Sequence, residues 1–259
     1  MEGTCSSQKT VNHLDTFEAL RAKELRRKVL DFALETGVGH LGGALSAIEI
    51  LISLYDKILN PEDKFILSKS HACNPFYLLL REKGHNPKIA DHCDIDEKNG
   101  ICCTTGSLGH GLPIGLGMAF ARKKLNKNGR IYILIGDGEC QEGTIWESAD
   151  IAAYHKLDNV TVIVDNNEVQ ALDKIKDVSL MNFKDKFNAF GWHVSEINGH
   201  NFQEIIQALN EQPKGKPYVI IAHTIKGKGV SYMENNPAWH GRIVTPEELS
   251  KAYEELKND

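Results

Sequence analysis

The sequence predicts an α/β fold in which a doubly wound, mostly parallel sheet carries helices on both faces. Short apolar segments alternate along the chain with segments of helical periodicity. Two of the apolar segments, VTVIV (160–164) and YVIIA (218–222), are apolar on both faces, which is typical of strands in a sheet that is covered on both sides. Because no linker, repeat or low-complexity stretch interrupts the chain, we expect a single domain over residues 1–259.

The first half of the chain is expected to be mainly helical. Residues 14–35 place apolar side chains at helical spacing opposite a charged face, and residues 45–59 predict a second helix. A short strand, FILS at 65–68, is followed by a helix at about 74–84. Residues 109–125 are rich in glycine and other small residues, and they predict a helix that packs closely against its neighbour.

The second half of the chain predicts the alternation of a parallel sheet. Expected strands lie near 131–135, 160–164, 192–195 and 218–222, and expected helices lie near 143–156, 183–189 and 201–210. The tail from Thr245 predicts a short capped helix, because Thr245-Pro246-Glu247-Glu248 combines a capping box with a proline in the first turn.

Composition is that of an ordinary soluble globular protein. Of the 259 residues, 41% are hydrophobic and 25% are charged, and the formal net charge is −5 with both signs mixed along the chain. This balance gives no reason to expect nucleic acid or a membrane as a partner. The start, MEGTCSSQKTVNHLD, has no basic segment leading into an apolar one, and no stretch reaches the roughly 18 apolar residues of a membrane span. We therefore expect a cytoplasmic protein.

The cysteines predict free thiols rather than disulfides. Six cysteines lie at positions 5, 73, 93, 102, 103 and 140, and none of them forms a CxxC pair. Without a secretory signal we expect a reducing compartment. Adjacent Cys102 and Cys103 could ligate a metal ion, but the sequence has no second pair to complete four ligands, so a zinc site is not expected.

Polar residues follow two of the predicted strands at the point where each strand ends. Gly136-Asp137-Gly138 comes after IYILI, and Asn166-Asn167 comes after VTVIVD. Ligands of a parallel sheet bind at the carboxyl ends of the strands, and the glycines allow the backbone to approach a ligand closely. A carboxylate, an amide oxygen and a backbone carbonyl just beyond Asn167 are ligands that a hard divalent cation prefers, together with phosphate oxygens.

A helix follows Cys140, and its amino end is expected to favour the same phosphate. The sequence therefore predicts a magnesium or calcium ion at Asp137 and Asn167 that holds a diphosphate. A plainer interpretation is that Asp137 only caps the helix that follows, since the tripeptide GDG by itself is a weak signal.

A longer pattern points to a family. The segment from GDG to NN at 136–167 resembles the thiamine diphosphate motif, which opens with GDG and closes with NN about thirty residues later. Four further segments are similar to transketolase segments and stand in the same order: ETGVGHLGGALSAIEIL (35–51), DKFILSKSHACNPFYLLLREKG (63–84), CCTTGSLGHGLPIGLGMA (102–119) and AHTIKGKGVSYMENNPAWHG (222–241). The chain thus resembles a transketolase, specifically the N-terminal subunit of those transketolases that are split over two chains.

The resemblance implies which residues hold the cofactor, thiamine diphosphate, and its metal. Asp137, Asn167 and the carbonyl of Val169 match the ligands of the metal ion, Mg²⁺ or Ca²⁺. The positions that match cofactor contacts are His71, Gly106, Ser107, Leu108, Asp137, Gly138, Glu139, Asn167, Lys226 and His240. Glu142 matches a glutamate of the contact between subunits.

The resemblance also implies the reaction, which is transfer of a two-carbon ketol unit from a ketose or ketose phosphate to an aldose or aldose phosphate. The cofactor supplies the electron sink, while the protein positions the reactants and moves protons. Histidine is suited to proton transfer near neutral pH. By position within or near the matched segments, the catalytic histidines are His40, His71, His240 and His92.

Three positions depart from the family pattern. His92 lies in DHCDIDEKNG, which is acidic where the family usually has HPD followed by a basic, proline-containing stretch. GHG at 109–111 replaces the usual GQG, and SKSH at 68–71 replaces SKGH or SNGH. These departures concern the sugar acceptor more than the cofactor, and they leave open a specialised ketol or acyl transferase that acts on a non-standard sugar.

The resemblance implies a partner as well. Enzymes of this kind need a glutamate from a second α/β domain to activate the cofactor, and the residues after Gly241 are too few to form that domain. We therefore expect a separate C-terminal subunit to supply the glutamate, in an α2β2 heterotetramer. A non-catalytic paralogue that keeps the fold as a binding partner is the remaining alternative, and the presence of Asp137, Asn167, His40 and His240 argues against it.

Overall fold

A parallel sheet forms the centre of the protein. The computed structural model describes residues 13–171, 173–179 and 182–258, and these residues form a five-stranded sheet with the order β1-β2-β3-β5-β4. All four strand pairs are parallel. The strands are β1 (Lys64–Leu67), β2 (Ile131–Gly136), β3 (Val160–Asn166), β4 (His193–Asn198) and β5 (Tyr218–His223). The predicted doubly wound α/β fold is thereby confirmed.

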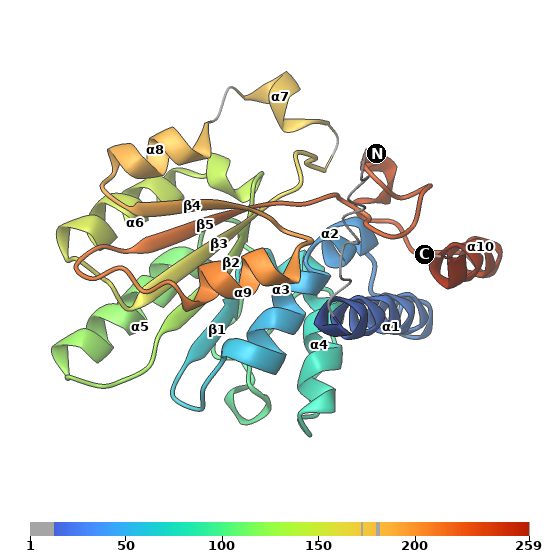
Figure 1. Ribbon diagram of the computed structural model, residues 1–259, viewed down its shortest axis with the longest axis horizontal. Helices are drawn as coiled ribbons and strands as arrows, with labels where there is room; N and C mark the ends of the chain where they lie inside the picture. The colour runs from blue at the N-terminus through green and yellow to red at the C-terminus, as the bar shows by residue number, and fades with distance from the viewer. Residues whose placement is uncertain (1–12, 172, 180–181, 259) are drawn as a thin grey trace, which may run out of the picture.

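Helices cover both faces of this sheet (Figure 1). One face carries α1 (His13–Thr36), α2 (Leu41–Ser46), α3 (Ile48–Ser53), α4 (Cys73–Glu82) and α9 (Phe202–Asn210). The other face carries α5 (Gly111–Lys124), α6 (Gly143–Tyr154) and α8 (Phe183–Ala189). Helix α10 (Pro246–Asn258) packs beside α1, and the short α7 (Ile175–Val178) follows the loop after β3.

The sheet separates two hydrophobic cores. In β2, Tyr132 and Leu134 face the core below α1–α4, whereas Ile131, Ile133 and Ile135 face the core below α5 and α6. Successive residues of a strand point to opposite faces. Because helices cover both faces of the sheet, all of these side chains are buried. Burial on both faces explains why β2, β3 and β5 are mainly apolar, as the sequence led us to expect.

The same alternation sorts the polar residues at the end of β3. Asp165 hydrogen-bonds to Ser46 of α2, on the face of the α1–α4 core. Asn166 points to the opposite face, where its amide contacts His223 of β5. Asn167 again contacts Asp165, so the two neighbouring asparagines have different surroundings.

The helix predicted at 45–59 is wrong in its limits. The chain instead forms α2 and α3, separated at Ala47, and then a single π-helical turn at Leu54–Ile58. The break follows Ser46, whose hydroxyl bonds to the Gly43 carbonyl within α2 as well as to Asp165. A serine hydroxyl bonded back to its own helix often bends the helix.

The other predicted elements are confirmed within a few residues, including the capped helix at the carboxyl end. Thr245 Oγ1 accepts a hydrogen bond from the Glu248 N–H, and the Glu248 side chain accepts one from the Thr245 N–H. This reciprocal pair is the predicted capping box at the start of α10. The short helix α7 was not predicted.

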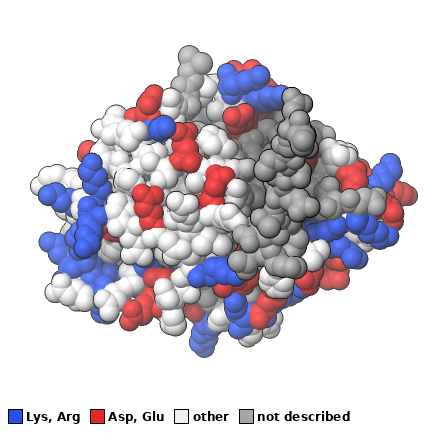
Figure 2. Space-filling model, viewed as in Figure 1, with Lys and Arg blue, Asp and Glu red and all other residues white. Residues whose placement is uncertain are grey.

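The surface of the protein carries both signs of charge. On the face shown in Figure 2, acidic and basic side chains are interspersed, with Lys and Arg concentrated towards the edge at which α5 ends. Within the described ranges, none of the helices has the length and apolar character needed to cross a membrane. The cysteines in the described part of the chain, Cys73, Cys93, Cys102, Cys103 and Cys140, are free thiols, as predicted, and Cys5 lies outside that part.

Two glycines of α5 provide a matched test of the close packing predicted for this helix. A Cβ atom at Gly111 would overlap Ser68 Oγ and lie 2.9 Å from Ser68 Cα, whereas a Cβ atom at Gly117 would meet nothing within 4 Å. We expect Gly111→Ala to lower the free energy of unfolding by about 1–3 kcal/mol through overpacking. Gly117→Ala should raise it by about 0.5–1 kcal/mol through helix propensity. Urea unfolding of both variants checks this, and equal effects would contradict it.

Candidate active site

A cavity of about 300 Å³ lies at the carboxyl ends of the central strands. It is lined by the turn after β2 (Gly136–Glu139), the loop after β3, the segment after β1 and the loops that carry His40, His92 and His240. The residues of its wall are His40, Gly43, Lys69, Ser70, His71, His92, Gly106, Leu108, Gly136, Asp137, Gly138, Glu139, Asn167, Val169, Gln170, Ala171, Lys226 and His240. Segments from most of the chain therefore meet here.

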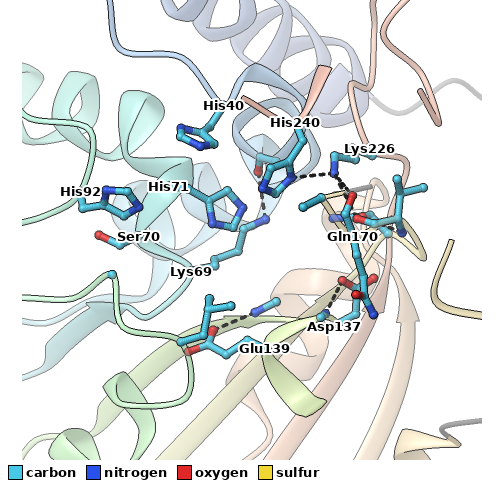
Figure 3. Close-up of a pocket in the computed structure, with 18 residues that line it drawn as sticks. His40, Lys69, Ser70, His71, His92, Asp137, Glu139, Gln170, Lys226 and His240 are labelled. Atoms are coloured by element: carbon cyan, nitrogen blue, oxygen red, sulfur yellow. Dashed lines mark hydrogen bonds between the residues drawn. The ribbon is translucent and has the colours of Figure 1, made fainter. Parts of the chain in front are cut away.

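Four imidazoles form one end of the cavity (Figure 3). The ring centroid of His40 lies 5.6 Å from that of His71 and 5.9 Å from that of His92. The His240 centroid lies 5.5 Å from His40 and 5.2 Å from His71. The structure thus brings together all four histidines that the sequence proposed as catalytic, including His92 in its unusual context.

His40 holds a backbone conformation that few residues other than glycine adopt. Its φ is 62° and its ψ is 35°, and it stands immediately before α2 as the N-cap residue. Such a left-handed conformation is uncommon for a residue with a Cβ atom, and it concentrates at functional sites. His40 Nδ1 is buried and has no hydrogen-bond partner among the described residues.

The environment keeps the imidazoles of His71 and His240 neutral. Burial is the main cause that lowers the pKa of His71 well below its usual value, and the positive charge of Lys69 adds to it. Burial and then the Lys226 ammonium lower the pKa of His240 to about 4. Lys226 Nζ donates to His240 Nδ1 at 3.0 Å, so the neutral ring carries its proton on Nε2. A neutral imidazole both accepts and donates hydrogen bonds, which suits proton transfer.

The depressed pKa of His240 gives a pH-dependent contribution to stability. Below pH 6.5 the unfolded chain takes up a proton at this position that the folded protein does not take up until about pH 4. The wild type should therefore lose stability relative to His240→Gln as the pH falls from 6.5 towards 4. Denaturant unfolding of both proteins, above pH 6.5 and within this window, measures the difference. A difference that does not change with pH would contradict the assignment.

At the other end of the cavity, the carboxylate of Asp137 joins the turns after β2 and β3. One oxygen accepts a hydrogen bond from the Gly138 N–H at 2.7 Å, and the other accepts one from the Glu168 N–H at 2.6 Å. Helix α6 begins later, at Gly143, and its N-cap Glu142 makes no side-chain cap. The plainer interpretation of Asp137 as a helix cap is therefore wrong.

Asp137 lacks a compensating cation in direct contact within the described structure. Burial and the neighbouring Asp165 carboxylate raise the pKa of Asp137 to about 7, against the two backbone hydrogen bonds that lower it. Lys226 Nζ instead bonds to the carbonyls of Val169 (3.1 Å) and Gln170 (2.9 Å). A buried carboxylate of this kind is stabilised by a bound cation.

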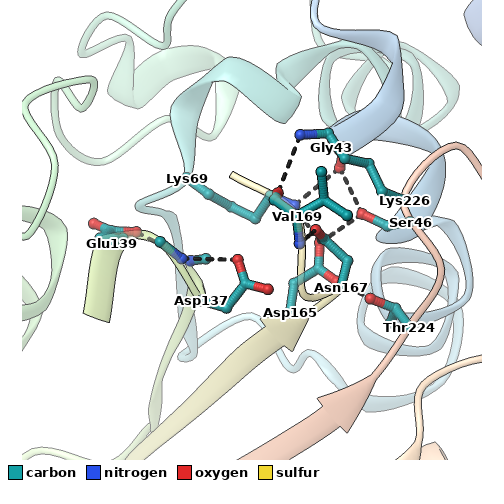
Figure 4. A network of polar contacts seen from close by, with 12 residues as sticks. Gly43, Ser46, Lys69, Asp137, Glu139, Asp165, Asn167, Val169, Thr224 and Lys226 are labelled. Atoms are coloured by element: carbon teal, nitrogen blue, oxygen red, sulfur yellow. Dashed lines mark hydrogen bonds and ion pairs between the residues drawn. The ribbon is translucent and has the colours of Figure 1, made fainter. Parts of the chain in front are cut away.

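Asp165, in contrast, is fully engaged by the protein (Figure 4). Its carboxylate accepts hydrogen bonds from Lys69, Ser46 and Thr224, and it lies 3.5 Å from the Asn167 amide nitrogen. Burial opposes its charge, but the Lys69 ammonium and the hydroxyl donors keep the pKa of Asp165 below its usual value. Because its oxygens are occupied in this way, Asp165 is a structural carboxylate rather than a metal ligand.

The Asp165 contact also orients Asn167. The amide nitrogen of Asn167 is directed towards Asp165, and its Oδ1 accepts the Val169 N–H at 3.2 Å. Asp137, Asn167 and Val169 all belong to this wall of the cavity, where the Asn167 amide oxygen accepts the Val169 N–H and the Val169 carbonyl accepts Lys226 Nζ. Together they offer the oxygen ligands that a hard cation prefers.

The protein alone does not complete a metal site. The described residues include no group of three or more His, Cys, Asp or Glu side chains that could hold a metal ion. One carboxylate, one amide oxygen and one carbonyl are too few for a six-coordinate cation, so water or a bound molecule would add the other ligands. This donor set fits a cation that is shared with a phosphate group.

Glu139 supports the turn after β2. Its carboxylate accepts hydrogen bonds from the Ser68 hydroxyl and from the backbone N–H groups of Gly109 (2.8 Å) and Gly136 (3.2 Å). Burial raises its pKa, against these hydrogen bonds. Glu139 lines the cavity, and its contacts fix the turn that carries Asp137, while its contact with the cofactor stays a prediction.

Two predicted parts of the site lie outside the cavity wall. Ser107 is exposed, with its hydroxyl 3.2 Å from His110 Nδ1, and its contact with the cofactor stays a prediction. The amino end of α6 does not line the cavity either, since the wall at this point is the Gly136–Glu139 turn. Glu142 is exposed, next to Gly109, and its predicted place in a contact between subunits stays a prediction.

Sequence reasoning missed several residues of the site. Gln170 lines the cavity, and its Nε2 is buried with no hydrogen-bond partner in the described part of the chain. Lys69 and Asp165 form the buried ion pair beside Asn167. A signal for the pair existed, because Asp165 ends an apolar strand and Lys69 stands between serines after another. Nothing in the sequence distinguishes Gln170 from an exposed loop residue.

Comparison with known proteins identifies close relatives. Residues 18–259 match the family described as transketolase, thiamine diphosphate binding domain. The chain is 38% identical to one subunit of the apulose-4-phosphate transketolase of Actinobacillus succinogenes, over 92% of this chain and 95% of that protein. It is 37% identical to 6-deoxy-6-sulfo-D-fructose transketolase subunit SqwG of a Clostridium species, over 92% of this chain and 96% of that protein.

Longer relatives match over part of their length. The chain is 32% identical to the transketolase of Homo sapiens, over 91% of this chain and 41% of that protein. Among solved structures, transketolase from Campylobacter jejuni aligns with a TM-score of 0.84 at 30% identity, over 93% of this chain and 43% of that one. Transketolase from Leishmania mexicana aligns with a TM-score of 0.87 at 23% identity, over 93% of this chain and 41% of that one. At this identity the similarity shows the fold alone. The chain therefore spans about two fifths of these longer enzymes.

Proposed function

The chain belongs to the family of transketolase thiamine diphosphate-binding domains, and on this basis we propose that it is the N-terminal subunit of a split transketolase. In this proposal the chain binds thiamine diphosphate through Mg²⁺ or Ca²⁺, and a separate C-terminal subunit completes the active site. The assembled α2β2 enzyme transfers a two-carbon ketol unit from a ketose phosphate to an aldose phosphate.

The observation that carries this proposal is the pattern of coverage among relatives. The chain covers 95% and 96% of two proteins named as transketolase subunits, but 41% of a longer transketolase. The similarity to the subunits thus extends over nearly the whole of both proteins. This pattern supports a separate partner, which the naming of these relatives as subunits implies for them.

The residues present in the cavity fit the proposed cofactor. Asp137, Asn167 and the Val169 carbonyl would hold the cation, whose remaining ligands would include diphosphate oxygens. Lys226, with a pKa lowered by burial and by Lys69 to about 8, stays mainly positive at neutral pH beside this position. When bound, the cofactor supplies the electron sink for breaking a carbon–carbon bond next to a carbonyl group.

Two residues of the cavity wall each carry a buried polar atom that no described residue pairs. His40 Nδ1 and Gln170 Nε2 have no partner among the described residues, although both are enclosed by protein. Buried polar groups are nearly always hydrogen-bonded in native proteins, so such atoms are expected to bind a ligand or an ordered water. His40 belongs to the imidazole cluster of the cavity wall, and Gln170 belongs to the part of the wall that carries the candidate metal ligands.

The histidines give the chain its own part in the reaction. During ketol transfer a hydroxyl group of the ketose must lose a proton and the carbonyl oxygen of the aldose must gain one, and imidazoles can accept and donate protons. His40, His71, His92 and His240 lie at the end of the cavity opposite Asp137. We assign them to holding the sugar hydroxyls and moving their protons.

Reconstitution with the partner tests this proposal. The chain should be purified alone and together with the product of the neighbouring gene, with thiamine diphosphate and Mg²⁺ present in both cases. Ketol transfer is expected only from the combination, because the activating glutamate comes from the partner. Transfer by the chain alone would contradict the split-site proposal, and no transfer by any combination with any ketose would contradict the catalytic assignment.

A specialised sugar substrate is the second candidate, and the relatives give it specific support. Two of the relatives that are named as subunits carry the names of apulose 4-phosphate and of 6-deoxy-6-sulfo-D-fructose rather than of common sugar phosphates. His92, which the acidic segment carries, lies at the same end of the cavity as the other proposed catalytic histidines. A screen of ketose donors and aldose acceptors with the assembled enzyme distinguishes the two candidates.

A further inference from the structure

His92 lies on a loop whose backbone is hydrogen-bonded at the histidine and at the residue that follows it. The Tyr77 hydroxyl donates to the His92 carbonyl at 3.3 Å. The next N–H, that of Cys93, donates to Ser70 Oγ at 2.6 Å, and the Cys93 carbonyl accepts the Thr105 N–H at 2.9 Å. The loop is therefore fixed between α4, the segment after β1 and the segment that leads to α5.

The imidazole of His92 is constrained as well. It packs against Gly106, where an added Cβ atom would lie 3.1 Å from His92 Cδ2 and 3.3 Å from His92 Cβ. Gly106 has a φ of 134°, a conformation that residues with a side chain rarely adopt. On another side the ring meets His40. The position of the ring therefore depends on where the backbone of the loop is held.

Ser70 connects this loop to the rigid centre of the site. It stands between Lys69, which pairs with Asp165, and His71, which belongs to the imidazole cluster. Ser70 and Cys93 are each 1% exposed, so water does not replace their hydrogen bond. Without the hydroxyl, the buried Cys93 N–H would lose its acceptor, and the loop would have to move to satisfy it.

The hydrogen bond joins two places where the sequence departs from the family pattern. Ser70 is the residue that makes the segment SKSH rather than SKGH or SNGH, and Cys93 belongs to the unusual DHCD context of His92. A glycine at position 70 would offer no side-chain acceptor. The two departures are thus coupled through one contact.

We propose that Ser70 is a positioning residue, which holds the Cys93 N–H so that the His92 imidazole faces the sugar in the active site. The inference rests on the proposed function, because it assigns to His92 a contact with the sugar during ketol transfer. In this inference Ser70 affects the reaction only through the position of the His92 side chain.

Removal of the hydroxyl should affect sugar turnover and leave the cofactor in place. In the assembled enzyme, Ser70→Ala is expected to lower kcat/KM for the sugar by about 10- to 100-fold, as small misplacements of reacting groups do. The affinity for thiamine diphosphate with Mg²⁺ should stay unchanged. Ser53→Ala is the matched control, because Ser53 is 1% exposed and its hydroxyl has no partner in the described structure.

A double-mutant cycle separates positioning from a general structural effect. If Ser70 acts through His92, then Ser70→Ala should lower kcat/KM in the wild-type background and cause no further loss in a His92→Ala background. An equal loss in both backgrounds would overturn the proposal, and so would an unchanged kcat/KM in Ser70→Ala.

A measurement without turnover keeps this inference separate from the proposed function. In the full chain with isotope-labelled histidine, Ser70→Ala should shift the ring signals of His92. The signals of His200, which is held by Glu49 and the Ile225 N–H, should stay in place and serve as the reference. Unchanged His92 signals would overturn the positioning role even if the enzyme is active. An inactive wild type with shifted His92 signals would instead contradict the proposed reaction.

Discussion

Lys69→Met is expected to lower the free energy of unfolding by about 3–5 kcal/mol, because it leaves a buried carboxylate without its counter-charge. Lys69 is 1% exposed and Asp165 is 0% exposed, and the two form an ion pair at the centre of the site. The loss would be a large part of the roughly 5–15 kcal/mol that stabilises a typical domain. Guanidinium unfolding, followed by circular dichroism, measures it.

A matched surface pair controls for the loss of a lysine. Lys257 pairs with Glu254 in the last turns of α10, and both side chains are largely exposed. Lys257→Met is therefore expected to change stability by less than about 1 kcal/mol. The double variant Lys69→Met/Asp165→Leu should recover part of the loss, since it also removes the unpaired charge. If Lys69→Met proves as stable as Lys257→Met, the buried pair does not have the role described here.

The second large effect concerns the two neighbouring asparagines at the end of β3. Asn167→Ala is expected to weaken metal-dependent binding of thiamine diphosphate by about 100-fold or more, which exceeds the roughly 10- to 100-fold loss typical of residues that only support a ligand. Asn167 lines the cavity, and its amide oxygen is one of the proposed cation ligands. Titration calorimetry of the assembled enzyme measures the affinity.

Asn166 provides the control within the same strand. It is 9% exposed, close to the 6% of Asn167, but its amide contacts His223 on the opposite face of the sheet. Asn166→Ala should therefore leave the affinity for the cofactor unchanged. Equal losses in the two variants would show that the effect comes from disturbance of the strand end and not from loss of a metal ligand.

The sequence was sufficient to predict the sheet, because the physical signal of a buried parallel strand is local. VTVIV and YVIIA are apolar at every other position and at most of the remaining ones, and both became central strands with a core on each side. The break at Ala47 was not predictable in this way. It follows Ser46, whose hydroxyl bonds to Asp165, a residue 119 positions away in the chain.

Some residues of the candidate site could likewise be predicted from local sequence, and others could not. Asp137 and Asn167 could be found because they end strands, and the positions of His40, His71 and His240 because they lie in segments that resemble a known family. The supporting residues were missed. Ser70 and Gln170 have no unusual spacing, and their roles follow from the loops that fold against them, a tertiary feature.

His92 shows where the structure adds most to the sequence. Its acidic surroundings in the sequence depart from the family pattern, yet its ring lies 5.9 Å from that of His40 in the wall of the cavity. The hydrogen bonds of Tyr77, Ser70 and Thr105 fix the loop at this place. These contacts come from three separate segments, so no local pattern could predict them.

The most direct test of the proposed site is the metal dependence of cofactor binding. Thiamine diphosphate should be titrated into the assembled enzyme with Mg²⁺ and again with a chelator, for the wild type and for Asp137→Asn. We expect binding by the wild type only when Mg²⁺ is present, and a strong loss in Asp137→Asn, because Asp137 holds the cation that holds the diphosphate. Binding of equal strength with the chelator, or in Asp137→Asn, would contradict this assignment.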